Sequence, residues 1–187
     1  MAIIKGTKFD DVLVSKKQGD ILLGGEGNDT LEARHGFNIL LGGEGDDQLI
    51  ASSSFNLLSG GAGNDYLLAY GSRNFLDGGD GDDGLIAFSD NNILSGGAGN
   101  DFLQIQFGSG SSGNILYGGK GDDTLAADAG TDNILNGDAG NDVLSTSSGN
   151  VANGGDGDDT LSSSSSLLKF ALVMQLFADS LSIHELR

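Results

Sequence analysis

The stretch Gly24-Gly25-Glu26-Gly27-Asn28-Asp29-Thr30-Leu31-Glu32 has the form G-G-x-G-x-D-x-U-x, in which U is a large apolar residue. The same nine-residue pattern starts again at Gly42, Gly60, Gly78, Gly96, Gly118, Gly137 and Gly154. The steps between successive starts are 18, 18, 18, 18, 22, 19 and 17 residues. Self-similarity at such a period predicts a solenoid, in which each repeat packs only against its neighbours.

A degenerate copy precedes these eight repeats. Residues 6–14 keep the aspartate at position six, Asp11, and the leucine at position eight, Leu13. Two of the three glycines are replaced, by Thr7 and Phe9. We therefore expect nine repeats of this kind, of which the first is altered.

Each unit has a second half of nine residues that lacks the glycine signature. From Asn38 onward its position six is an asparagine, and position eight is leucine in both halves except at Ala152. A leucine every nine residues fits neither a continuous helix nor a long strand. It predicts a chain that turns back every nine residues, with a three-residue strand whose leucine points inward and a six-residue turn.

Two halves then make one coil of 18 residues, and the coils stack as parallel strands about 4.8 Å apart. Nine coils over residues 1–161 would form a rod roughly 40 Å long.

The four extra residues within 104–113 predict a looser, protruding turn. Beyond the repeats we expect a serine-rich linker over 162–166 and an amphipathic helix within 167–187. The broader apolar face of that helix comprises Phe170, Val173, Met174, Phe177 and Leu181.

The composition is strongly acidic, with 27 Asp and Glu against 9 Lys and Arg and a formal net charge of -18. This sign argues against nucleic acid and anionic membranes as partners and favours cations.

The chain has no cysteine, which excludes thiolate metal sites. The first residues lack the apolar segment of a cleavable signal peptide, and no run is long enough to span a membrane. Only His35 and His184 are histidines and no nucleophile–base pair is legible, so we expect no enzyme activity.

The signature turn carries the chemistry of a hard cation. Glycines at positions one, two and four allow backbone conformations in which carbonyl groups converge. The aspartate at position six adds a carboxylate oxygen, and oxygen ligands alone favour calcium. One turn offers too few ligands for the six to eight of calcium, so each ion is expected between two stacked turns. The aspartates concerned are Asp11, Asp29, Asp47, Asp65, Asp83, Asp101, Asp123, Asp142 and Asp159.

The free-energy balance predicts that calcium drives folding. Stacked carboxylates about 5 Å apart repel by roughly 3 kcal/mol per pair at an effective dielectric constant of 20. A buried leucine contributes about 1.5–3 kcal/mol, so the leucine column barely offsets the aspartate column. Chain entropy is then unopposed, and we expect the metal-free chain to be largely unfolded.

The second halves predict a metal-free edge and an outward apolar surface. Stacked asparagine amides can hydrogen-bond up the column without an ion, so the calcium column should run along one edge only. Position seven of these halves, which we call the apolar stripe, is Ile21, Ile39, Leu57, Phe75, Ile93, Ile115, Ile134 and Val151. Strand alternation points it outward, where the C-terminal helix or a second copy, in a homodimer, could cover it. The alternative is a wider core that encloses both positions seven and eight.

The signature resembles the RTX family of hemolysin-type calcium-binding nonapeptide repeats, over residues 6–161. The resemblance implies a right-handed parallel β-roll. It also implies that an ion is bound by the carbonyls of positions two and four and the aspartate of one turn, with the carbonyls of positions one and three and the aspartate of the next. Between the Gly24 and Gly42 turns these ligands are Gly25, Gly27, Asp29, Gly42, Glu44 and Asp47.

Extended to all turns, the scheme implies about 7–8 calcium ions. The further backbone positions are Gly24, Gly43, Gly45, Gly60, Gly61, Ala62, Gly63, Gly78, Gly79, Asp80, Gly81, Gly96, Gly97, Ala98, Gly99, Gly118, Gly119, Lys120, Gly121, Gly137, Asp138, Ala139, Gly140, Gly154 and Asp156. Two features depart from the family pattern: only alternate half-turns carry the signature, and Asp138 replaces a second glycine.

The resemblance further implies export by a type I secretion system through an uncleaved C-terminal signal, and a secreted or cell-surface location. Two other functions are compatible with a calcium solenoid. An ice-binding or adhesin segment would require a regular threonine array at position three, which is absent. A polysaccharide-binding or targeting module of a secreted enzyme would require a basic or aromatic groove, which the sequence does not reveal.

Overall fold

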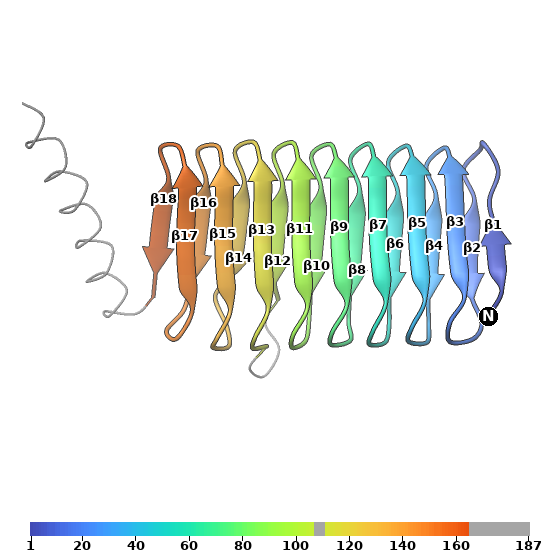
Figure 1. Cartoon of the computed structure of the whole chain (residues 1–187), viewed down its shortest axis with the longest axis horizontal. Helices are drawn as coiled ribbons and strands as arrows, with labels where there is room; N and C mark the ends of the chain where they lie inside the picture. The colour runs from blue at the N-terminus through green and yellow to red at the C-terminus, as the bar shows by residue number, and fades with distance from the viewer. Residues whose placement is uncertain (107–110, 165–187) are drawn as a thin grey trace, which may run out of the picture.

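Strands begin at position seven of every half-unit, after each turn. The computed structural model describes residues 1–106 and 111–164, which form two parallel sheets of nine strands each (Figure 1). One sheet holds β1 (Ile3–Lys5), β3 (Ile21–Glu26), β5 (Ile39–Glu44), β7 (Leu57–Ala62), β9 (Phe75–Asp80), β11 (Ile93–Ala98), β13 (Ile115–Lys120), β15 (Ile134–Ala139) and β17 (Val151–Asp156). The other holds β2 (Val12–Ser15), β4 (Thr30–Ala33), β6 (Gln48–Ala51), β8 (Tyr66–Ala69), β10 (Gly84–Ala87), β12 (Phe102–Ile105), β14 (Thr124–Ala127), β16 (Val143–Thr146) and β18 (Thr160–Ser163).

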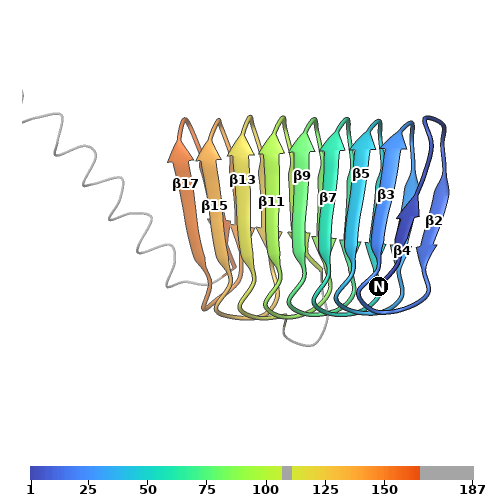
Figure 2. The ribbon, with the colours of Figure 1, turned by 45° about the vertical axis from the view of Figure 1, so that its right-hand side comes forward.

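The coils stack in the predicted register. In the first sheet Ile21 pairs with Ile39 and Leu22 with Leu40, one full coil apart. The second sheet pairs in the same way, as Leu31 does with Leu49. Turns therefore fall into two straight rows, one at each end of the strands (Figure 2). The predicted all-β parallel solenoid is confirmed.

The expected three-residue strands are too short, most clearly in the first sheet. Its strands from β3 onward have six residues and run through positions one to three of the signature. Gly25 pairs with Gly43 and Glu26 with Glu44, so the first half of the signature belongs to the ladder. The sharp reversal is confined to positions four to six, because positions one to three still belong to the paired strand.

The leucines at position eight form the core between the two sheets. From Leu22 to Leu144 every one of them has no exposed surface. Small residues at the ends of the second-sheet strands complete the core, among them Ala33, Ala51, Ala69, Ala87 and Ala127. Each coil thus contributes two buried leucines, worth about 1.5–3 kcal/mol each.

Position seven of the first sheet points outward, which excludes the wider core. In the apolar stripe, Leu57 and Phe75 are each 38% exposed and Val151 is 61% exposed. Ile21, Ile39 and Ile115 are half-buried. Alternation along the strand places these side chains opposite the leucines. An unbroken apolar row therefore lies on the outer face of this sheet.

The irregular regions are only partly described. Ile105, at the end of β12, is buried at a position where five other coils have alanine. Residues 107–110 of the predicted protruding turn lie outside the described residues. Strand β18 continues through Ser163, two residues into the serine run. The helix expected within 167–187 lies outside the described residues.

Candidate metal sites

The signature turns form the upper row in Figure 1, and their aspartates are joined by hydrogen bonds from coil to coil. The backbone N–H of Asp29 donates to Oδ1 of Asp47 at 2.7 Å. The same bond recurs between successive aspartates up to Asp142 and Asp159. One oxygen of each carboxylate from Asp29 onward is therefore satisfied by the preceding coil.

The asparagine edge uses the same bond but differs in its second side-chain atom. The N–H of Asn56 donates to Oδ1 of Asn74 at 2.8 Å. The amide Nδ2 of Asn56 then donates to the Ser53 carbonyl at 2.9 Å, and that of Asn74 to the Gly71 carbonyl at 2.8 Å. The predicted hydrogen-bonded asparagine column is confirmed, and it needs no ion.

On the aspartate edge the corresponding atom, Oδ2, has no partner. Seven such oxygens are buried without a hydrogen bond in the described chain, those of Asp29, Asp47, Asp65, Asp83, Asp101, Asp123 and Asp142. An unpaired buried polar atom costs about 1–3 kcal/mol, and more when it is charged. A column of seven such atoms is the expected signature of bound cations.

The backbone carbonyls of the signature face the same gaps between coils. A Cβ on Gly24 would collide with both Oδ2 of Asp29 and the carbonyl oxygen of Gly42, which therefore points back toward the earlier coil. A Cβ on Gly43 or Gly45 would collide with the carbonyl oxygen of Gly25 or Gly27, which point forward. Only glycine leaves this space free.

The position-three carbonyls also point back toward the earlier coil. The N–H of Gly45 donates to the Ala62 carbonyl at 2.8 Å, and the N–H of Gly81 to the Ala98 carbonyl at 2.7 Å. A carbonyl has a second lone pair, so this bond leaves it able to bind an ion. Each gap thus brings together carbonyls from positions one to four of two turns and a buried carboxylate oxygen.

This donor set fits calcium. It consists only of oxygen, which hard cations prefer, and it combines carboxylate with carbonyl ligands. In the described residues no three acidic, histidine or cysteine side chains converge on one point. Backbone oxygens must therefore supply most of the ligands, which explains why the signature fixes glycines rather than further acids.

Two turns depart from the signature sequence, the one that starts at Gly6 and the one that starts at Gly137, which borders two of the predicted sites. Oδ2 of Asp11 accepts hydrogen bonds from the N–H of Thr7 at 2.6 Å and from its hydroxyl at 2.8 Å. Thr7 therefore satisfies the first aspartate without an ion. Asp138, by contrast, keeps the positive φ of the glycine it replaces, at 73°. This φ is smaller than the 111–127° of the glycines at the same position in the other signature turns.

Burial raises the pKa values of the column aspartates in the metal-free fold. The pKa reaches about 7 for Asp65, Asp83 and Asp123, and about 6 for Asp47 and Asp101. Loss of solvation is the largest cause, and neighbouring aspartates add to it, as Asp47 does for Asp65. Hydrogen bonds from the backbone act in the opposite direction but are weaker.

Acid is therefore expected to stabilise the metal-free fold. An unfolded aspartate has a pKa near 3.9, so a folded pKa of about 6–7 makes folding bind protons. This contribution is fully present below about pH 4 and is lost as pH rises through 6–7. In excess chelator, circular dichroism should show more strand at pH 5 than at pH 8. A strand signal that instead rose with pH would contradict these shifts.

A second ladder runs along position five, and sequence reasoning missed it. Its residues alternate strictly between aspartate and asparagine: Asp10, Asn28, Asp46, Asn64, Asp82, Asn100, Asp122, Asn141 and Asp158. Each Oδ1 accepts the N–H of the following coil, the reverse of the position-six direction. Exposed carboxylates are thereby kept two coils apart. The alternation of aspartate and asparagine at position five is present in the sequence and could have predicted this ladder.

Comparison with known proteins bears on the same turns. A family model for the RTX calcium-binding nonapeptide repeat (four copies) matches residues 5–40, 17–49, 41–76, 50–85, 69–103, 109–144, 131–151 and 136–165. A search of curated proteins found no match. In the described residues no helix is long and apolar enough to cross a membrane. The matched ranges include every signature turn.

Proposed function

The chain belongs to the RTX calcium-binding nonapeptide repeat family, and we propose that it is a non-enzymatic module that folds when calcium fills one edge of its solenoid. The coils would be assembled outside the cell, after type I export in an unfolded state. A chain of net charge -18 with stacked aspartates resists collapse where calcium is scarce. Millimolar extracellular calcium would then act as the trigger for folding.

The observation that carries this proposal is the row of seven buried, unpartnered Oδ2 atoms. Each lies in the gap between one signature turn and the next, where carbonyl oxygens from both turns also point. Seven gaps separate the eight turns that start from Gly24 to Gly154. We therefore assign one calcium ion to each of these gaps and none to the gap closed by Thr7.

Calcium stoichiometry tests this assignment. Equilibrium dialysis against calcium at pH 8, with protein measured by amino-acid analysis, should give about seven ions per chain at saturation. The Thr7→Gly variant frees the Asp11 carboxylate and should bind one ion more. Fewer than about four calcium ions per chain at saturation would contradict the proposal. Affinities are expected near the 10⁻⁴–10⁻³ M typical of extracellular modules.

A further inference from the structure

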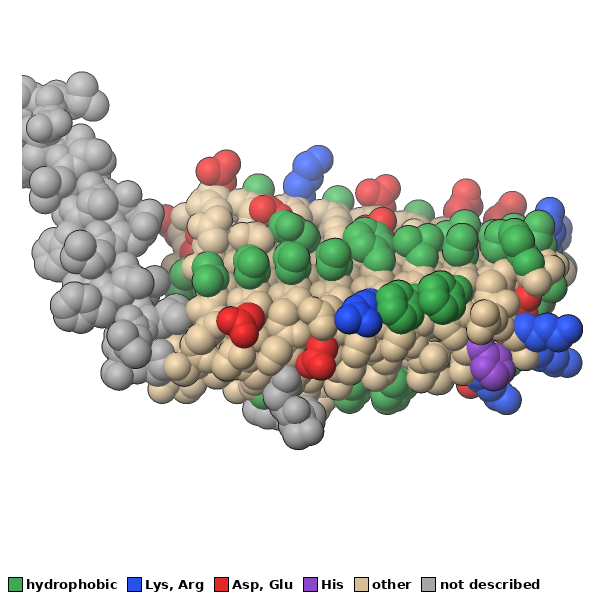
Figure 3. Space-filling view, turned by 60° about the horizontal axis from the view of Figure 1, so that its bottom comes forward, with side chains coloured by type: hydrophobic (Ala, Val, Ile, Leu, Met, Phe, Trp, Pro, Cys, Tyr) green, Lys and Arg blue, Asp and Glu red, His purple; other side chains and the backbone are tan. Residues whose placement is uncertain are grey.

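The apolar stripe is a continuous row of exposed and half-buried hydrophobic side chains on the described part of the chain. Its eight residues lie one above another on the outer face of β3 to β17, at the edge next to the asparagine turns. Figure 3 shows the resulting unbroken row of hydrophobic side chains along the rod. The same position of the other sheet is mixed and includes Thr30, Gln48 and Gly84. A continuous row on only one sheet favours a specific occupant.

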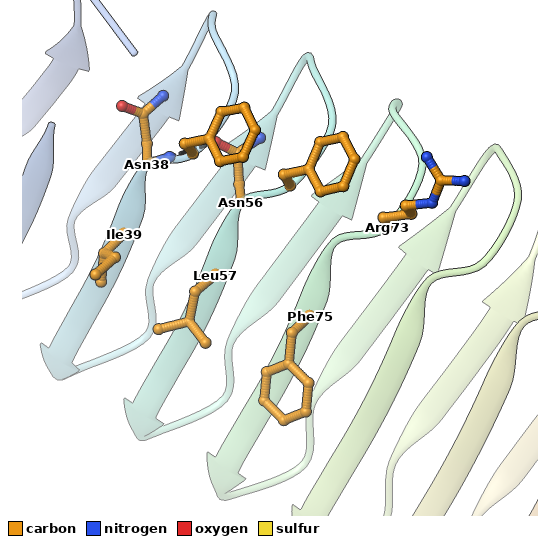
Figure 4. A pocket seen from close by; sticks show the side chains of 8 residues that line it. Asn38, Ile39, Asn56, Leu57, Arg73 and Phe75 are labelled. Carbon is orange, nitrogen blue, oxygen red and sulfur yellow. Dashed lines mark hydrogen bonds between the residues drawn. The ribbon is translucent and has the colours of Figure 1, made fainter. Parts of the chain in front are cut away.

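A short aromatic ledge runs beside the stripe at its N-terminal end. The rings of Phe37 and Phe55 stack with centroids 5.0 Å apart, and the Arg73 guanidinium lies 5.4 Å from the Phe55 centroid. An open groove of about 320 Å³ lies between the ledge and the stripe. The ledge lines one side of it, and Leu57 and Phe75 of the stripe line the other (Figure 4). The groove continues the apolar surface toward the first coils.

The ledge residues are held in an unfavourable backbone conformation. Phe37, Phe55 and Arg73 have φ values of 63°, 63° and 58°. The equivalent residues of other asparagine turns are glycine, asparagine or aspartate, which tolerate this region. Three bulky side chains in a row at such positions indicate a requirement other than stability of the turn.

The chain leaves the solenoid at the edge where the stripe lies. Strand β18 runs toward the asparagine turns, so Ser164 emerges in that row (Figure 1). From there the stripe can be reached without crossing a sheet. Five coils separate Ser164 from the turn that precedes Phe75, which is about 24 Å. As a helix, the 15 residues 167–181 would span about 22 Å, and the linker residues 164–166 cover the remaining distance.

We propose that residues 167–181 lie as a helix along the apolar stripe and run back toward the N-terminal coils. One helical turn advances about 5.4 Å and one coil about 4.8 Å, so each turn of the helix meets one coil. Phe170 then faces Ile134, and Phe177 faces Ile93 two coils further on. Met174 falls between them at Ile115, and Leu181 reaches Phe75.

The tether favours this intramolecular partner over a second copy. A short linker raises the local concentration of the segment at the stripe to the millimolar range. The predicted apolar face carries one large residue per turn, which matches one stripe residue per coil. Residues after Leu181 reach the groove beside the aromatic ledge. This inference depends on the solenoid fold and not on how many calcium ions it binds.

Engineered disulfides test the proposed register, since the chain has no native cysteine. Two matched pairs, Ile134→Cys with Phe170→Cys and Ile93→Cys with Phe177→Cys, should oxidise within one chain in saturating calcium. The crossed pair, Ile134→Cys with Phe177→Cys, is a control that introduces cysteines at the same positions but combines them in the wrong register. Thr124→Cys with Phe170→Cys probes the opposite sheet. We expect matched pairs to form intramolecular disulfides at least tenfold faster than either control.

Other outcomes overturn the proposal. Disulfides between chains, at a rate that rises with protein concentration, would assign the stripe to a second copy. Equal rates for matched and control pairs would show that the segment does not dock in this register. Hydrogen exchange provides a check without cysteines: amides of 167–181 should be protected in the native chain. Ile93→Lys with Ile134→Lys should abolish that protection, whereas Thr124→Lys on the other sheet should preserve it.

Discussion

Chelating calcium at pH 8 is expected to unfold the solenoid and abolish its strand signal in circular dichroism. Seven carboxylates with raised pKa values would be ionised at this pH, and each buried Oδ2 would lack a partner. Neighbouring charges one coil apart repel by roughly 3 kcal/mol per pair at an effective dielectric constant of 20. Each coil offers two buried leucines in return, about 3–6 kcal/mol, from which the entropy of ordering the chain must be subtracted.

Calcium added back should restore the strand signal over a narrow concentration range, because each ion links two coils. Magnesium at the same concentration is the control. It demands a tighter octahedral shell and gives up its waters reluctantly, so it should restore little of the signal. A full strand signal in excess chelator at pH 8 would show that the leucine column suffices without metal.

Exchanging aspartate for asparagine on one edge should change the calcium requirement for folding, whereas the reverse exchange on the other edge should change stability independently of calcium. Asp83→Asn replaces an unpartnered Oδ2 with an amide that can donate to the Gly96 carbonyl, which faces the same space. Because Oδ2 of Asp83 faces the gap between the Gly78 and Gly96 turns, this variant should bind about one ion fewer. We expect its calcium midpoint for folding to rise roughly tenfold, the equivalent of about 1.4 kcal/mol.

Asn74→Asp is the matched exchange on the other edge. It removes the amide that donates to the Gly71 carbonyl and places a buried carboxylate oxygen against that carbonyl. The fold should lose about 1–3 kcal/mol of stability, measured by urea unfolding in saturating calcium. Higher calcium should not rescue it, because this turn lacks the glycines of the signature. Calcium rescue of Asn74→Asp would mean that both edges can hold ions.

Much of this architecture follows from a nine-residue leucine repeat. The predictions of parallel coils, of inward leucines and of a hydrogen-bonded asparagine column are confirmed, since each depends on one residue type at a fixed spacing. The length of the first-sheet strands was not predictable in this way. Glycine at positions one and two is compatible with a turn or with an extended strand, and pairing of Gly25 with Gly43 across coils decides between them.

The candidate sites were predicted as a pattern, but their distinguishing atom was not. The sequence indicates that aspartate stacks on aspartate, without revealing that the backbone satisfies one oxygen and leaves the other bare. It likewise cannot show that Thr7 closes the first site, because that depends on a side chain reaching Asp11 across a turn. The bulky residues at positive φ, such as Phe55, are equally invisible, since the conformation is imposed by the stacked neighbours.

Because of the position-five ladder, coils with an even number and coils with an odd number are not equivalent in the rod. Aspartate and asparagine alternate there, so the smallest unit that repeats without change is a pair of coils. Removing the coil that contains Asn64 would set Asp46 directly against Asp82, whereas removing two adjacent coils would leave the alternation intact. Lengthening or shortening the rod is therefore favoured in steps of two coils, and a designed or duplicated variant with an even step should retain more stability than one with an odd step.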